Sequence, residues 1–157
     1  MVDATNAALA NVPPDRVRLH VCWGSYEGPH THDVELEPLL PHLYRAHAGA
    51  LVLSMANPRH AHAHEHRVLA RNPPPREWRV IAGVIDTTTN YVEHPEVVAE
   101  RIERAVTALG DPHRVLAGTD CGFATSAGFG DVAEEIVWEK PRSLRAGADL
   151  ATKRLLG

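Results

Sequence analysis

The chain has 157 residues, which suits one hydrophobic core of moderate size, and we expect residues 1–157 to form one domain or part of one. Charged residues make up 23% of the sequence and the formal net charge is −4, a balance that excludes a basic surface for nucleic acid. The longest apolar runs, ALVLSMA and RVIAGVI, are too short to cross a bilayer, and the N-terminus lacks a signal-peptide pattern. We therefore expect a cytoplasmic protein that binds neither membrane nor nucleic acid.

Short apolar runs alternate with stretches of helical spacing along the chain. The runs rich in Val, Ile and Leu predict buried strands at 16–23, 50–56, 78–86 and 113–121. Helical patterns are found at 2–10, 34–49, 94–110 and 131–156. We expect Gly110 to end the third of these helices, and Pro141 to kink or split the last one because proline has no amide hydrogen to donate.

This alternation of strands and helices predicts right-handed crossovers and a parallel α/β sheet. A complete (β/α)₈ barrel needs about 250 residues and eight strands. The chain is too short for that, so the pattern leaves two architectures open, a small open α/β sheet and half of a barrel.

Three potential metal ligands lie at the carboxyl ends of predicted strands, at the sheet edge where parallel α/β proteins place functional groups. His20 and Cys22 are two positions apart, so their side chains point to the same face, and Cys121 ends the fourth predicted strand between Gly118 and Gly122. One histidine and two thiolates form a ligand set typical of catalytic zinc with an open position. The alternative is two small buried thiols and a hydrogen-bonded histidine. A disulfide framework is not expected from only two cysteines.

The sequence contains 11 histidines, and several of them follow the second predicted strand in the run HAHAHEH. The histidines of this run are His60, His62, His64 and His66. Histidine-rich tracts can supply metal ligands, although a solvated loop or the start of a helix is the more common structure for such a run.

Further polar residues lie near the predicted strand ends. Asp86 and Asp120 are candidate catalytic residues, able to orient a substrate or support a metal ligand, or else they cap turns. Trp23, Asn57 and Arg59 are candidates for substrate binding. For Asn57 and Arg59 the alternative to binding an anionic group is simply to build the turn.

Four segments resemble one enzyme family: RLHVCWGSYEGPHTHD, ANPRHAHAHEH, GVIDTTTNYVEHPE and GTDCGF. They are similar to the C-terminal catalytic domain of cobalamin-independent methionine synthase, in the branch with archaeal short forms and epoxyalkane:coenzyme M transferases. The resemblance covers nearly the whole chain, with the motifs in the same order. It implies a zinc enzyme on a (β/α)₈ barrel, in which a substrate thiol binds zinc as a thiolate and attacks an electrophilic carbon.

The resemblance also implies a ligand set. The family binds zinc through a histidine and a cysteine on one strand, a glutamate on the next and a cysteine on the last. His20, Cys22 and Cys121 match three of these, whereas Ser54 stands at the glutamate position. The nearest replacements for that glutamate are His60, His62 and Glu65.

By the same resemblance, the chain corresponds to strands five to eight, the second half of the barrel. The expected activity is zinc-dependent S-methyl transfer from a methyl donor to a small thiol, with homocysteine as acceptor and methionine as product. An epoxide-opening coenzyme M thiol transferase is the related alternative, and a non-catalytic zinc-binding half-barrel is the alternative of another class. Because a half-barrel leaves two sheet edges open, we expect a homodimer or a complementary half-barrel chain as partner.

Overall fold

The structure is a computed structural model that describes residues 2–25, 28–60, 63–124, 130 and 132–157. Its parallel sheet has the strand order β1-β2-β3-β4. The strands are β1 (Arg18–Val21), β2 (Ala50–Leu53), β3 (Arg79–Ile85) and β4 (Val115–Thr119). They confirm the four predicted strands, each somewhat shorter than its apolar run. Within the described residues, no helix combines the length and apolar character needed to cross a membrane.

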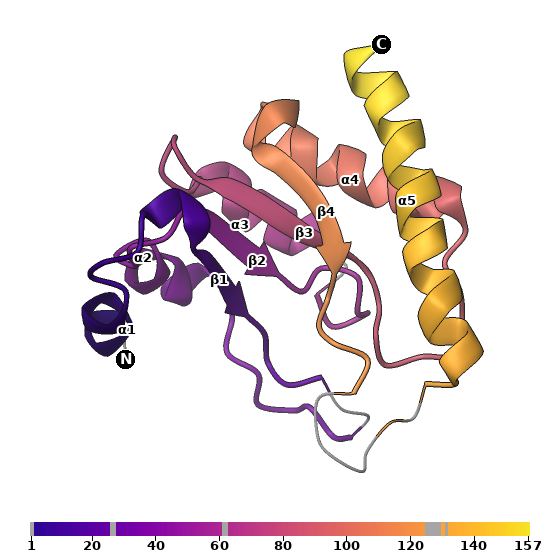
Figure 1. Ribbon diagram of the computed structural model, residues 1–157, viewed down its shortest axis with the longest axis horizontal. Coiled ribbons are helices and arrows are strands. Elements are labelled where there is room, and N and C mark those ends of the chain that lie inside the picture. The colour runs from indigo at the N-terminus through magenta and orange to yellow at the C-terminus, as the bar shows by residue number, and fades with distance from the viewer. Residues whose placement is uncertain (1, 26–27, 61–62, 125–129, 131) are drawn as a thin grey trace.

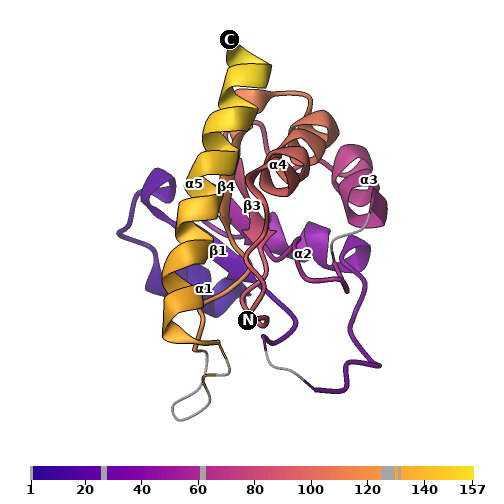
Figure 2. The same cartoon turned by 90° about the vertical axis from the view of Figure 1, so that its right-hand side faces the viewer.

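Each strand pairs with the next strand along the chain (Figure 1). A doubly wound open sheet reverses its strand order at a switch point, whereas a (β/α)₈ barrel does not. Helices α3 and α4 contact each other and lie on the same side of the sheet in both views (Figures 1 and 2). In a barrel, too, the helices cover only the outer face of the sheet. The strand order therefore selects the half-barrel from the two architectures that the sequence left open.

The helices alternate with the strands. They are α1 (Val2–Ala8), α2 (Leu40–Leu43), α3 (Ala63–Arg71), α4 (Pro95–Leu109) and α5 (Glu134–Leu156), with single 3₁₀ turns at Pro14–Arg16, Glu37–Leu39 and Pro112–Arg114. Helix α4 confirms the prediction for 94–110, and Gly110 follows it in the left-handed conformation with φ 71°. The main core lies between strands and helices, where Leu51, Leu53 and Val84 pack with Val98 and Ile102.

Two helix predictions are wrong in detail. The segment 34–49 forms only a 3₁₀ turn and the one-turn helix α2, because Pro38 and Pro41 cannot donate backbone hydrogen bonds there. Leu36 and Leu40 are nevertheless buried. The spacing of the apolar residues therefore reflects which side chains enter the core, and it does not indicate a long helix. Helix α5 runs continuously through Pro141, so the predicted split does not occur, and the predicted kink stays a prediction.

Tertiary contacts beside Pro141 anchor α5 to the loop after β3. The side chain of Lys140 is fully buried, and its Nζ donates to the Tyr91 carbonyl at 2.5 Å and to Glu93 Oε2 at 3.1 Å. The hydroxyl of Ser143 donates to the Glu93 carbonyl. Glu93 Oε1 in turn accepts the backbone N–H of Asp86 at 2.8 Å, so this buried ion pair fixes the carboxyl end of β3.

A buried aspartate joins the carboxyl ends of the strands. The carboxylate of Asp120 accepts the backbone N–H groups of Met55, Ala56 and Asn57 at 2.8, 2.9 and 2.7 Å. Its own N–H donates to the carbonyl of Ile85 at 2.9 Å. Burial raises the pKa of Asp120 to about 6, although the three N–H donors act to lower it.

A glycine makes room for this carboxylate. A Cβ built on Gly83 of β3 would lie 2.1 Å from Asp120 Oδ1, which no side chain can occupy. The bare backbone of Gly83 therefore lets Asp120 reach across β3 to the end of β2.

We predict that Asp120→Asn lowers the free energy of unfolding by about 2 kcal/mol, because one acceptor oxygen becomes an N–H₂ group facing a buried backbone N–H. Urea unfolding of the metal-free protein measures the change. The matched control is Asp111→Asn, since Asp111 accepts a single N–H, from His113, at an exposed turn where an amide oxygen serves equally well. Equal stability of the two variants would contradict the role assigned to Asp120.

Candidate metal centre

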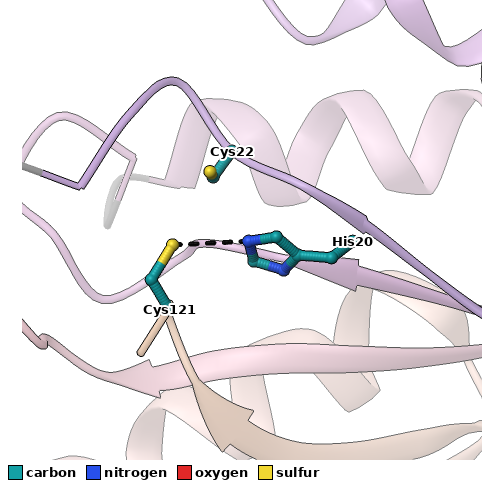
Figure 3. Close-up of side chains that lie close together, drawn as sticks. All are labelled: His20, Cys22 and Cys121. Carbon is teal, nitrogen blue, oxygen red and sulfur yellow. Dashed lines mark hydrogen bonds between the residues drawn. The ribbon is translucent and has the colours of Figure 1, made fainter. Parts of the chain in front are cut away.

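The three predicted ligands lie together at the carboxyl edge of the sheet (Figure 3). His20 is on β1, Cys22 follows the end of β1, and Cys121 follows β4 by two residues. Their donor atoms all lie within 4.8 Å of one another, and His20 Nε2 is 3.3 Å from Cys121 Sγ. In the part of the chain that the structure describes, this is the group of His, Cys, Asp or Glu side chains with metal-binding spacing.

The local structure explains why these side chains converge. His20 pairs in register with Val52, Val52 with Ile81, and Ile81 with Leu116, so this row of side chains shares one face of the sheet. The core residues of β2, Leu51 and Leu53, alternate with Val52 and point to the opposite, helix-covered face. His20 therefore faces the side of the sheet that corresponds to a barrel interior.

The donor set suits zinc. Both cysteines are free thiols, as expected, and Cys22 is exposed whereas Cys121 is half-buried. Burial and the neighbouring Cys22 thiol raise the pKa of Cys121 to about 11, so in the absence of a cation this thiol keeps its proton. A divalent metal reverses this preference, because two thiolates and an imidazole nitrogen are strong zinc ligands.

A buried serine stands at the position where the resemblance implies a glutamate ligand. Ser54 is 6% exposed, and its hydroxyl donates to the Asp120 carbonyl at 3.0 Å. Among the described residues, no carboxylate joins the three donors within 4.8 Å. Three protein ligands among the described residues would therefore be available to a zinc ion, which is the number typical of catalytic zinc with one open position.

The proposed replacements for the glutamate take a different arrangement. His60 Nδ1 and Glu65 Oε1 are 3.0 Å apart and both residues are buried, but neither belongs to the group of three donors. The ring of His60 stacks on Trp23, with centroids 4.2 Å apart. His62 lies outside the described residues.

The predicted substrate contacts form part of the wall of the site. Arg59 donates to Asn57 Oδ1 from both Nε and its backbone N–H, and it also donates to Asp33 at 2.5 Å and to the Gly24 carbonyl at 2.9 Å. These bonds favour the turn-building role that the sequence left open for Asn57 and Arg59. Trp23 Nε1 donates to the Val34 carbonyl at 2.6 Å, which holds the indole in place.

The two candidate catalytic aspartates have structural hydrogen bonds. Asp86 Oδ1 accepts the backbone N–H of Thr88 at 2.9 Å and the hydroxyl of Thr88 at 2.8 Å. This is the geometry of a residue that caps a turn, which was the alternative role given for Asp86. Asp120 accepts the three backbone N–H groups described above. Both aspartates hold the backbone around the candidate metal centre, and a catalytic role for either stays a prediction.

A small cavity connects the metal centre with these side chains. Its lining residues are Cys22, Trp23, Gly24, Ser25, Ser54, Asn57, Arg59, His60, Asp86, Thr88, Asp120 and Cys121. Sequence reasoning missed Ser25 and Thr88, since hydroxyl residues in loops carry no pattern. It also missed the support that Lys140 and Glu93 give to Asp86, because a lysine in a helix is usually exposed.

Comparisons with known proteins agree with this arrangement. No family model matches the chain. A curated relative is 2-hydroxypropyl-CoM lyase of Xanthobacter autotrophicus (strain ATCC BAA-1158 / Py2), 26% identical over 145 residues, with 78% of this chain and 38% of that protein covered. A solved structure with the same fold is the B12-independent methionine synthase of Shewanella sp. W3-18-1 in complex with selenomethionine. Its TM-score is 0.73 at 20% identity, with 99% of this chain and 43% of that chain covered.

The chain thus spans about two fifths of the length of these two proteins. The structural likeness places its strands on the barrel of a cobalamin-independent methionine synthase, and the sequence likeness is to a coenzyme M lyase. Both comparisons confirm the resemblance drawn from the four motifs, and with the strand order they identify the fold as half of a methionine-synthase-like (β/α)₈ barrel.

Proposed function

We propose that this chain is a zinc-dependent, S-methyltransferase-like domain that activates a thiol, with homocysteine as the acceptor and methionine as the product. The observation that carries the proposal is the convergence of His20, Cys22 and Cys121 at the carboxyl edge of a methionine-synthase-like half-barrel. When bound, zinc would supply a thiolate at neutral pH from a thiol whose ordinary pKa is about 8.5.

The residues of this chain would hold and orient the reactants. His20, Cys22 and Cys121 would hold the metal, and Ser54 leaves one position beside them for the substrate sulfur. Trp23 and His60 form one wall of the cavity. The thiolate sulfur then attacks the methyl carbon of the donor, a sulfur–carbon bond forms, and the donor leaves with the electron pair of its bond to that carbon.

A second candidate has support of its own. The curated relative is a 2-hydroxypropyl-CoM lyase, so a thiol-transfer reaction that opens an epoxide with coenzyme M is the alternative chemistry for the same metal centre. Both reactions need an activated thiol and differ in the electrophile.

We further propose that a second half-barrel covers the open side of the sheet. In the described residues β1 and β4 each pair with one strand only, and Leu116 is exposed on the face that would be a barrel interior. Unpaired strand edges and exposed apolar side chains favour association, with a second copy or with a complementary chain.

We expect the purified protein to bind about one zinc ion per chain, because the three donors have the composition of a zinc site. Cys22→Ser and Cys121→Ser should each lose most of that zinc, as measured by elemental analysis after dialysis. Thr107→Ala, which changes an exposed side chain on α4, keeps all three donors and serves as the control. A folded native protein without zinc would contradict the proposal and favour a non-catalytic half-barrel.

The reaction itself is tested by its products. Zinc-loaded protein supplied with homocysteine and a methyl donor such as methyltetrahydrofolate should form methionine, and the Cys121→Ser variant should form at least about 100-fold less. Coenzyme M and an epoxide are supplied in a parallel reaction. Appearance of a coenzyme M thioether, with no methionine, would favour the second candidate over the first.

A further inference from the structure

We propose that His60, oriented by Glu65, accepts the proton that the substrate thiol loses on binding. This inference rests on the proposed function and adds a residue to it. The three metal ligands account for the sulfur of the substrate, whereas the released proton needs an acceptor of its own. His60 is the residue whose contacts fit that need.

The first observation is a buried nitrogen without a partner. His60 is 5% exposed, and within the described residues its Nε2 makes no hydrogen bond. Leaving a buried polar atom unpaired is destabilising, so native proteins rarely do so without a reason. His60 lines the cavity that Cys22 and Cys121 also line, which places this ring beside the metal centre.

The second observation is the partner of the other ring nitrogen. His60 Nδ1 is 3.0 Å from Glu65 Oε1, and Glu65 is 4% exposed. An ionised carboxylate only accepts hydrogen bonds, so Nδ1 carries the hydrogen and Nε2 presents its lone pair. A proton taken up at Nε2 creates an imidazolium that the buried carboxylate of Glu65 stabilises directly.

The third observation is that the other charged groups lining the cavity shared with Cys22 and Cys121 already have partners. The guanidinium of Arg59 donates to Asp33 and to the Gly24 carbonyl. The carboxylates of Asp86 and Asp120, which line the same cavity, accept hydrogen bonds from nearby backbone N–H groups. The Trp23 ring stacks on His60 and keeps it in place without offering it a polar atom.

The proposed step balances. The S–H bond of the thiol breaks, its proton moves to His60 Nε2, and the bonding electron pair stays on sulfur. No oxidant or other reactant is needed. When the thioether product leaves, the proton passes from Nε2 to solvent or to the departing methyl donor.

The test counts protons instead of products. Homocysteine is titrated into zinc-loaded protein by calorimetry in buffers of different ionisation enthalpy at pH 7.5. Native protein should release clearly less than one proton per thiol bound, because the buried Glu65 carboxylate lets His60 hold the proton. His60→Gln should release about one, since the proton then goes to the buffer. Glu65→Gln should release an intermediate number.

The control is His64→Gln, which changes a neighbouring histidine on α3 and should behave like the native protein. If native protein releases about one proton per thiol, the role of His60 is overturned and the proposed function still stands. This outcome can be measured even if the His60→Gln variant does not fold. Zinc-loaded native protein that binds no homocysteine overturns both.

Discussion

The buried carboxylate of Asp120 is the interaction on which the candidate site depends. It accepts three backbone N–H groups from the segment after β2, while its own backbone is bonded to the end of β3 and leads out of β4. Because Cys121 is the next residue and Ser54 directly precedes the bonded segment, one side chain fixes the position of both. Hydrogen bonds from several N–H groups to one carboxylate are among the stronger interactions in proteins. The geometry of the candidate metal centre therefore depends on these hydrogen bonds between the strand ends, and Gly83 provides the space for the Asp120 carboxylate.

A second buried charge fixes the neighbouring part of the edge. The ammonium group of Lys140 on α5 reaches the loop after β3. There it donates to the Glu93 carboxylate, which also accepts the backbone N–H of Asp86. Buried ion pairs seldom add much net stability, but removing one partner leaves the other buried and uncompensated. The pair thus specifies how α5 sits against the loop. It also accounts for a helix that continues through Pro141, since tertiary contacts on both sides of the proline compensate for the lost hydrogen bond.

The sequence predicted what depends on local pattern. Runs of Val, Ile and Leu identified the four strands, Gly110 identified the end of α4, and the spacing of His20 and Cys22 placed both on one face. The predictions from sequence failed where contacts between residues far apart in the chain determine the structure. The segment 34–49 has helical spacing because it buries Leu36 and Leu40, yet its prolines limit it to a single turn. The pairing of His60 with Glu65 could not be read from HAHAHEH, because which histidine points inward depends on how α3 packs against the sheet.

The central claim is that one zinc ion is held by His20, Cys22 and Cys121, and X-ray absorption of the zinc-loaded protein tests it most directly. The account predicts two sulfur neighbours at about 2.3 Å and one imidazole nitrogen at about 2.0–2.1 Å, with a third sulfur appearing when homocysteine is added. A zinc shell made of nitrogen and oxygen alone would contradict it, because the metal would then lie elsewhere, for example on the histidine-rich segment after β2.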